Sequence, residues 1–438
     1  MNMIGLKPVT KISKNKRGES MKRTSGKLLA ALAVFGLLAA GCGGDDSSSE
    51  STTEDTAAEE TAVAAPTGEP IKVMTVTTLN AAGPTYQNIA NTAEAYEAYV
   101  NARGGIGGRP LEVIVCDEQF DPAVAATCAR QAVEENVVAV VGSFTFFAES
   151  IVPVIEKSSI SWFGPCCPIT PSELTSKYSF PIGNQPMYAV GAIQHAIEVD
   201  KCEKLNAVII DGGQVFIPPM ENAMKAYGKE FGEIVIISGL AQDYSAEVAK
   251  ATAGVDCVAT VISETPYITW NTAWTQSGTT ARQYGPQGNL NEVSAKGNEE
   301  STDGDVIAGM YPDISTDAWS EFRLALEEAG LDTTEVDYNS LGGMGTWAAY
   351  VGFKMIAETI SGEITATSFF EAASNTSSLD LGGMVPVLDF TKEWTDGLAG
   401  YNRLFNRSVI FSVLEKGKVK PLTTEFVDVS NLAMGKKG

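Results

Sequence analysis

The sequence predicts an α/β protein made of two lobes, each with a Rossmann-like parallel sheet. Short apolar runs alternate with stretches of helical periodicity, and this alternation restarts near the middle of the chain. Roughly 370 of the 438 residues follow a distinct N-terminal segment, which is enough for two domains. Because alternating strands and helices favour parallel sheets with helices on both faces, we expect two such sheets.

The first half is expected to begin and end with a strand and to alternate strands with helices. The expected strands are 71–78, 111–117, 137–142 and 159–164, and the expected helices are 86–102, 122–135 and 148–157. The first helix has an apolar face that includes Ile89 and Tyr96. Asp121 is the expected N-cap of the second helix, and Pro122 its first residue.

The second half repeats this alternation from residue 205. Strands are expected at 205–211, 233–239, 257–263 and 305–311, helices at 218–231, 245–253, 316–330 and 345–361, and a late strand with a turn at 408–419. Ligands of open α/β sheets bind at the carboxyl ends of the strands. The loops that follow the strands of both lobes are therefore expected to face a cleft.

The N-terminal segment has the features of an export signal. Lys22, Arg23 and Lys27 precede the apolar run Leu28–Ala40, which is too short to span a bilayer but fits a signal-peptide core. Translation starts either at Met1 or at Met21. The predicted signal peptide is 1–41.

The apolar run ends in Ala39-Ala40-Gly41-Cys42, which resembles a bacterial lipobox with Ala39 in place of the usual Leu. This resemblance implies cleavage before Cys42 and lipidation of its thiol, and the alternative is an ordinary Cys just past a cleavage site. Residues 43–68 are rich in Gly, Ser, Thr, Ala and acids, so they cannot bury enough apolar surface to fold. We expect 42–69 to be a lipidated Cys with a disordered tether.

The charge and the single histidine exclude several function classes. The net charge of −23 argues against nucleic acid and against a broad membrane-surface contact, so the membrane is reached only through the lipid anchor. The acidic surplus is read mainly as a solvated surface. His195, the only histidine, lies in an apolar helical pattern and is expected to be partly buried. A His catalytic base or multi-His metal site is thereby excluded, and no metal or cofactor is expected.

Six cysteines follow Cys42, and an even number in an exported chain favours disulfides. Cys202 and Cys257 lie at the same end of two strands that would be neighbours in a 2-1-3 order, so a bond between them is expected. Cys116 ends a strand and Cys128 lies on the following helix, which predicts a second bond. Cys166 and Cys167 remain, either as a vicinal disulfide or as two buried thiols.

One segment carries a family resemblance. Residues 101–142, with "GGIGGRPLEV", an acidic turn and a "DP" helix start, resemble the branched-chain amino-acid type of periplasmic solute-binding protein, the receptor of an ABC importer. "GGIGG" follows a helix and precedes a strand, the reverse of what a phosphate-binding loop needs. The family has two lobes and a hinge of three chain crossings, which the resemblance places near 182–186, 309–314 and 395–405. It implies lobe 1 at 70–183 and 312–395, lobe 2 at 184–311 and 400–421, and a C-terminal tail at 422–438.

The resemblance also implies ligand-binding loops. The loop after the third strand, which in the family holds a ligand carboxylate with backbone N–H groups at a helix start, here contains Phe144, Thr145, Phe146 and Phe147. The alternative is that Phe146 and Phe147 are core residues of their helix. The other implied ligand contacts are Tyr86, Cys166 and Cys167 in "GPCCPITPSEL", Phe216 (or Val215), and Thr265, Tyr267 and Trp270 in "ETPYITW".

Gln287 in "GPQGN" stands where amino-acid binders of the family have an acidic residue that pairs with the ligand's ammonium. Glutamine cannot supply that charge, and a buried ammonium without a counter-ion is costly. We therefore expect leucine-like zwitterions to bind poorly. The expected ligand is neutral or weakly anionic with an apolar or planar body, such as an amide, an aromatic acid or a urea-like compound.

The function that this resemblance implies is that of a lipid-anchored receptor on the outer face of a bacterial cell membrane. It would be a monomer that captures a small molecule between its lobes and docks on ABC permease subunits. One alternative is a sensory or scavenging receptor with the same fold. An envelope enzyme is not expected, because no G-x-S-x-G elbow occurs and a His-containing triad would have His195 alone, although a carboxylate-pair hydrolase stays open.

Overall fold

The computed structural model describes residues 64–81 and 84–437. The predicted signal peptide, Cys42 and most of the predicted tether lie outside these ranges. None of the helices in the described part of the chain combines the length and the apolar composition that a membrane crossing requires.

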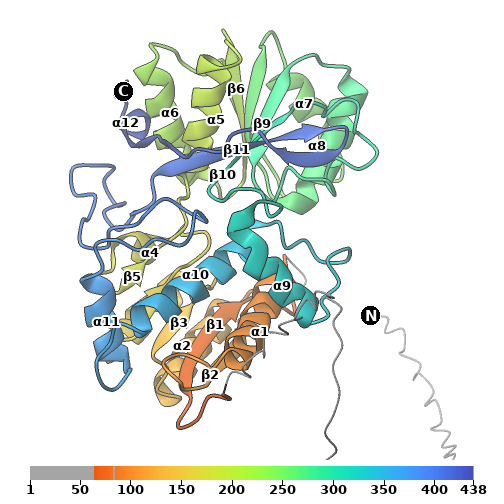
Figure 1. Ribbon diagram of the computed structural model, residues 1–438. Coiled ribbons are helices and arrows are strands. Elements are labelled where there is room, and N and C mark those ends of the chain that lie inside the picture. Colours follow the sequence, from red (N-terminus) through yellow and green to blue (C-terminus); the bar gives the residue numbers. More distant parts are fainter. Residues whose placement is uncertain (1–63, 82–83, 438) are drawn as a thin grey trace, which may run out of the picture. The chain divides into compact units, whose positions relative to one another are not determined.

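The first lobe is built on a five-stranded parallel sheet (Figure 1). Its strands are β1 (Ile71–Thr77), β2 (Leu111–Asp117), β3 (Ala139–Val141), β4 (Ser161–Phe163) and β5 (Ser179–Phe180), in the order β2-β1-β3-β4-β5. Ile71 pairs with Leu111, and Met74 pairs with Val140. The predicted parallel sheet of this lobe is confirmed, with β5 as an added edge strand that the sequence analysis did not include.

Helices cover both faces of this sheet because successive strand residues point to opposite faces. Val73 packs in a cluster with Ile89 of the helix α1, whereas Met74 packs on the other face with Ala125 and Ile151. The helices of this lobe are α1 (Gln87–Ala102), α2 (Pro122–Glu134), α3 (Val152–Ile155), α4 (Pro171–Thr175), α9 (Ser320–Glu328), α10 (Leu341–Ala357) and α11 (Ala366–Ser374). The predicted cap of α2 is confirmed, since the Asp121 side chain accepts hydrogen bonds from the N–H groups of its first turn.

The second lobe has a mixed sheet (Figure 1). Its strands are β6 (Leu205–Ile210), β7 (Ile234–Ile237), β8 (Cys257–Val261), β9 (Arg282–Pro286), β10 (Val306–Gly309), β11 (Ser408–Glu415), β12 (Lys418–Pro421) and β13 (Val427–Asp428). The order is β12-β11-β10-β9-β8-β6-β7, with β13 paired to β11. Strands β6 to β10 are parallel, whereas β11 and β12 form an antiparallel hairpin on β10.

The helices of the second lobe are α5 (Met187–Glu198), α6 (Ile217–Ala226), α7 (Ser245–Ala251), α8 (Glu264–Ser277) and α12 (Ser430–Ala433). Strand β9 and helix α8 were not among the expected elements, and the segment predicted as a ligand loop at 264–270 is the start of α8. The C-terminal segment contacts this lobe, because Asn222 of α6 donates a hydrogen bond to the carbonyl of Ala433 at 2.9 Å.

Three segments connect the two sheets, namely 181–186, 310–316 and the chain that leads into β11. Hydrogen bonds join them side by side. The Asn184 side chain donates to the Ser408 carbonyl, its backbone N–H lies 3.3 Å from Met310 Sδ, and Asn406 donates to the Ile182 carbonyl at 3.1 Å. The structure thus has a hinge of three crossings.

The two predicted disulfides are present. Cys116 is bonded to Cys128, and Cys202 is bonded to Cys257. The predicted neighbourhood of the strands that carry the second bond is also confirmed, since Cys257 pairs with Leu205 in adjacent parallel strands. Cys166 and Cys167 remain thiols.

Candidate ligand-binding site

Aromatic side chains gather at the carboxyl ends of β1, β2 and β3. Tyr86 packs edge-on against Phe144 at 4.9 Å between ring centroids, and Phe144 against Phe146 at 5.3 Å. Phe120 packs against Phe146 and Phe147 at 5.6 and 5.3 Å. We call Tyr86, Phe120, Phe144, Phe146 and Phe147 the aromatic cluster. Phe120 is 39% exposed and Phe146 is 43% exposed, so the cluster presents an apolar surface at this edge.

The predicted anion-binding loop is only partly retained. Ser143 Oγ accepts a hydrogen bond from Val76 N of β1 at 2.9 Å, and Thr145 Oγ1 accepts one from Phe147 N at 3.0 Å. Both hydroxyls are thus engaged by the protein's own main chain. The helix expected at 148–157 is broken into a 3₁₀ turn, Ala148–Ser150, the one-turn helix α3 and a second 3₁₀ turn, Glu156–Ser158. Its start therefore offers a much smaller dipole than a long helix. Phe147 packs against the core, whereas Phe146 does not, so the alternative that both are core residues is wrong for Phe146.

Glu118, two residues before Phe120 of the aromatic cluster, was missed as a site residue. Its carboxyl follows β2, is fully buried, and accepts a hydrogen bond from Thr78 Oγ1. Its Oε2 atom has no hydrogen-bond partner within the part of the chain that the structure describes. Burial raises the pKa of Glu118. The acidic turn after β2 in the sequence was the signal that could have indicated it.

The loop 164–174 brings the cysteine pair to the same region. Cys166 and Cys167 are buried, and their sulfur atoms are 3.0 Å apart. The buried Glu173 carboxylate shapes this loop by accepting hydrogen bonds from Trp162 Nε1 at 3.1 Å and from the N–H of Thr170 at 2.9 Å. Burial raises the pKa of Glu173 to about 7.

Phe216 of the second lobe meets this loop. It packs against Tyr188 of α5 at 5.4 Å between ring centroids. A small cavity of about 10 Å³, about the size of one water molecule, lies here. Its lining includes Pro168 and Ile169 of the first lobe, Val215 and Phe216 of the second, and Gln185, Pro186, Leu174 and Tyr401. The structure therefore brings together the predicted Phe216 and the predicted cysteine loop.

The predicted contacts in 264–270 are corrected by the structure. Tyr267 and Trp270 are fully buried in the core of the second lobe, because this segment is helical and turns both rings inward. The Tyr267 hydroxyl is hydrogen-bonded to Thr260, and Trp270 Nε1 donates to Gln283 at 3.2 Å. Thr265 is exposed on the first turn of α8.

Gln287 is placed differently from the prediction. Its Oε1 accepts hydrogen bonds from the backbone N–H groups of Met310 and Tyr311, each at 3.2 Å, and its Nε2 donates to the Tyr311 carbonyl at 2.8 Å. The amide is 6% exposed. It fastens the end of β9 to the second crossing, which leaves little of its hydrogen-bonding capacity for a ligand.

Carboxylates of the two lobes meet at Asn291, in the loop after β9. Asn291 Nδ2 donates to Glu264 Oε1 of α8 at 2.8 Å and lies 3.3 Å from Asp337 Oδ2 of the first lobe. Asn88, two residues after Tyr86, donates to the Asp337 carbonyl at 3.2 Å. Burial and the neighbouring Glu264 raise the pKa of Asp337 to about 6, and burial also raises the pKa of Glu264. Sequence reasoning missed this group because its members are far apart in the chain.

The electrostatic surroundings of this region are acidic. Burial raises the pKa of Tyr86 well above its usual range, and Cys167, Cys166, Glu118 and Glu264 raise it further. Among the described residues, no cluster of three or more His, Cys, Asp or Glu side chains is arranged to hold a metal ion.

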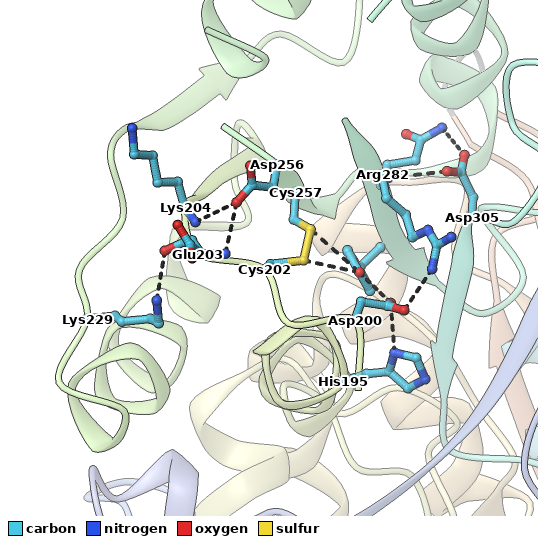
Figure 2. The surroundings of a disulfide bond; sticks show 12 residues. His195, Asp200, Cys202, Glu203, Lys204, Lys229, Asp256, Cys257, Arg282 and Asp305 are labelled. Carbon is cyan, nitrogen blue, oxygen red and sulfur yellow. Dashed lines mark hydrogen bonds and ion pairs between the residues drawn. A yellow bond between two sulfur atoms is a disulfide. The ribbon is translucent and has the colours of Figure 1, made fainter. Parts of the chain in front are cut away.

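A separate region surrounds the Cys202–Cys257 disulfide at the other end of the second sheet (Figure 2). A cavity of about 450 Å³ lies there, lined by residues that include Lys204, Lys229 and Glu233. His195 Nδ1 lies 3.3 Å from Asp200, which also pairs with Arg282 at 2.8 Å. Burial lowers the pKa of His195. His195 lies on α5, as predicted, but is buried and not only partly buried as expected. Its contact with Asp200 helps to hold this end of the lobe.

Comparisons with known proteins agree with this architecture. A family model described as periplasmic binding protein matches residues 70–398. No curated protein sequence matches the chain significantly.

Solved structures with the same fold align with this chain over nearly their own whole length. The alignment to a substrate-binding periplasmic protein from Ralstonia solanacearum has a TM-score of 0.67 at 17% identity and covers 80% of this chain and 99% of that one. The ABC transporter substrate binding protein from Aeropyrum pernix gives 0.67 at 17%, covering 84% and 100%. The fatty acid ABC transporter substrate-binding protein from Thermomonospora curvata gives 0.65 at 19%, covering 84% and 95%. At these identities the likeness shows the fold, and the family match over most of the chain shows that this chain belongs to the periplasmic binding protein family, with its two-lobed type I fold.

Proposed function

We propose that this chain is the extracytoplasmic substrate-binding lipoprotein of an ABC importer and that it captures a small organic solute between its lobes. The observation that carries the proposal is the family match over residues 70–398. It is supported by the aromatic cluster and by Glu264, which follow the carboxyl ends of strands, where open α/β sheets bind ligands. Asp337 of the first lobe joins Glu264 through Asn291.

The proposed ligand is a neutral or cationic solute with an apolar body. The aromatic cluster offers ring faces and edges to such a body, and aromatic rings also attract cations. Glu118, Glu264 and Asp337 would repel a buried anion, and the uncompensated charge would be costly. Aromatic acids, which the sequence favoured alongside amides and ureas, are therefore the least suitable of that group.

Binding is proposed to act through the hinge. Asn291 of the second lobe contacts Asp337 of the first, and Asn88, two residues after Tyr86, contacts the same Asp337. A ligand beside Tyr86 would therefore contact both lobes, and these contacts would exist only when the lobes are together. A ligand shifts a hinge equilibrium only by its difference in affinity for the two states.

Anchoring through Cys42 is part of the proposal and has its own test. The full chain is expressed in a bacterial host that is fed an alkyne-labelled fatty acid, with Cys42→Ser as the variant. Label on the wild-type protein and none on the variant is the expected result. An unlabelled wild-type protein in the soluble envelope fraction would contradict the anchor while leaving the binding proposal intact.

The ligand class is tested with four probes that separate charge from shape. The full chain is mixed with benzamide, benzyltrimethylammonium, benzoate and leucine, and thermal stabilisation and calorimetric binding are measured. We expect benzamide or benzyltrimethylammonium to raise the melting temperature, and benzoate and leucine to have little effect. Micromolar binding of leucine or benzoate would overturn the proposed ligand class.

The role as a receptor is tested separately by native mass spectrometry of the full chain, followed by a broad solute screen. A co-purified or stabilising small molecule supports the receptor. If no solute of any class binds, the solute-binding function is contradicted. An importer role further requires that loss of the chain lowers uptake of the solute that binds.

A further inference from the structure

The buried pair Cys166–Cys167 has no role in the fold described so far. The other four described cysteines are joined in disulfides, so these are the two thiols of the described chain. Cys166 is 1% exposed and Cys167 is 6% exposed, and their sulfur atoms are 3.0 Å apart. A disulfide would require these atoms to approach by only about 1 Å.

Cys166 is wedged between α10 and the first crossing. A Cβ atom on Gly345 of α10 would lie 2.5 Å from Cys166 Cβ, and a Cβ atom on Gly183 would lie 2.2 Å from the Cys166 carbonyl oxygen. Both positions accept Cys166 because they carry no side chain. A change in the backbone of the pair therefore acts directly on the crossing at 181–186.

The second crossing also touches the pair. A Cβ atom on Gly345 would lie 2.9 Å from the Tyr311 hydroxyl as well as close to Cys166, so these groups share one contact point. The Tyr311 hydroxyl is buried and has no hydrogen-bond partner among the residues that the structure describes. Two of the three hinge segments thus meet at the cysteine pair.

We propose that Cys166 and Cys167 form a reversible vicinal disulfide that acts as a redox-sensitive element of the hinge. The oxidant is a small disulfide of the glutathione type. One cysteine thiolate attacks it and releases one thiol, and the second cysteine then displaces the remaining half as a second thiol. Two S–H bonds of the protein are replaced by one S–S bond, and one molecule of the small disulfide is reduced to two thiols.

The geometry makes the bond reversible. Adjacent Cα atoms are about 3.8 Å apart, whereas disulfides usually join Cα atoms about 4.4–6.8 Å apart, and the resulting strain makes a bond easier to reduce. Pro165 and Pro168 flank the pair and restrict the backbone on both sides. Ring closure therefore moves the neighbouring hinge contacts instead of being absorbed by a flexible loop.

Access of the oxidant depends on the lobes. Burial raises the pKa of the Cys166 thiol, which slows attack while the pair is covered. Part of the cover comes from the second lobe, since Val215 and Phe216 line the same small cavity as Pro168 and Ile169, which directly follow the pair. Oxidation is thus expected in molecules whose lobes have separated. The further consequence, altered ligand affinity, rests on the proposed function.

The test uses the full chain and one tryptic peptide. Cleavage at Lys157 and Lys177 releases Ser158–Lys177, which contains both thiols and none of the other cysteines. The chain is incubated with oxidised glutathione or with dithiothreitol, alkylated and digested without reduction. We expect the peptide to lose about 2 Da and escape alkylation after oxidation, and to regain both thiols after mild reduction.

The hinge effect is read without any ligand, by hydrogen–deuterium exchange at 181–186 and 310–316. Exchange is expected to differ at least twofold between the oxidised and reduced wild type. The matched control is the double variant Cys166→Ser and Cys167→Ser, which keeps both structural disulfides and should show no difference. A peptide that stays as two thiols, or that carries glutathione, would overturn the modification. A ring that forms with unchanged exchange would overturn the hinge role. Failure of every solute to bind would not affect either readout.

Discussion

The side chain of Gln287 makes three hydrogen bonds to the main chain of the second crossing. Two of them require an acceptor and one requires a donor, which an amide can satisfy and a carboxylate cannot. The residue is therefore suited to holding the end of β9 against Met310 and Tyr311. This accounts for a Gln at the position where the family resemblance led us to expect an acidic residue that pairs with a ligand's ammonium.

Replacing Gln287 with Glu tests this role. A carboxylate at this position would face the Tyr311 carbonyl and would be buried without a counter-ion. We expect the free energy of unfolding at pH 7 to fall by about 3 kcal/mol, and by less at pH 4, where the new group can take up a proton. Urea denaturation gives both values.

The control for that substitution is Gln242→Glu, which makes the same chemical change in an exposed loop. It should change the free energy of unfolding by less than about 0.5 kcal/mol. If Gln287→Glu were as stable as this control, or if it gained affinity for leucine, its amide would be facing the ligand and not the crossing.

Helix α10 shows how a whole element is constrained by its surroundings. Glycine normally weakens a helix, yet Gly345 lies in the interior of α10. Its place is explained by the cysteine loop, because a Cβ atom would lie 2.5 Å from Cys166 Cβ. Gly352, two turns further on, has its nearest neighbour at 3.4 Å, an ordinary contact.

These two glycines predict opposite outcomes in one helix. Gly345→Ala should lower the free energy of unfolding by about 1–3 kcal/mol, because the loop or the helix has to shift. Gly352→Ala should be neutral or raise it by up to about 1 kcal/mol, because helix propensity improves without overlap. Thermal unfolding of both variants beside the wild type decides this, and equal effects would mean that Cys166 does not press on α10.

Among the secondary-structure elements, the sequence predicted those whose signals lie in neighbouring residues. The strands with continuous apolar runs, the cap at Asp121 and the two disulfides could be read from neighbours in sequence and from the strand order. Helix α8 could not, because its buried side is set by contacts with α7 and with side chains of β8 and β9, and the segment was expected to be a ligand loop.

The candidate site was less predictable than the fold for a related reason. Phe144 and Cys166 lie in loops that follow strands, so the strand pattern locates them. Gln287 and Tyr267 do not point into the predicted ligand site. The direction of a side chain depends on tertiary contacts that spacing in the sequence does not reveal. Asp337 and Glu264 are 73 positions apart and meet only through Asn291.

On the scale of the whole molecule, the contact of Asp337 with Asn291 joins one lobe to the other. The charged groups that act most strongly on Asp337 are Glu264 and Glu292, and both are acidic. No basic group among them offsets the cost of burying the Asp337 carboxylate. Its pKa of about 6 in the folded protein lies above the usual value of 3.8. The folded state therefore binds this proton more tightly than the unfolded state does.

The sign of the pH effect follows. Stability that depends on the protonated Asp337 is fully present below its usual pKa and is lost as the pH rises through about 6. Between pH 5 and pH 7 this residue should lower the free energy of unfolding by about 1 kcal/mol. Asp337→Asn should remove that part of the pH dependence, measured by urea denaturation at both values.

The control is Asp332→Asn in the same loop, where hydrogen bonds from Thr334 lower the pKa of Asp332, so its titration lies below this window. If Asp337→Asn kept the slope of the wild type, the carboxyl would not be buried between the lobes, and the acidic character proposed for the ligand region would lose its main support.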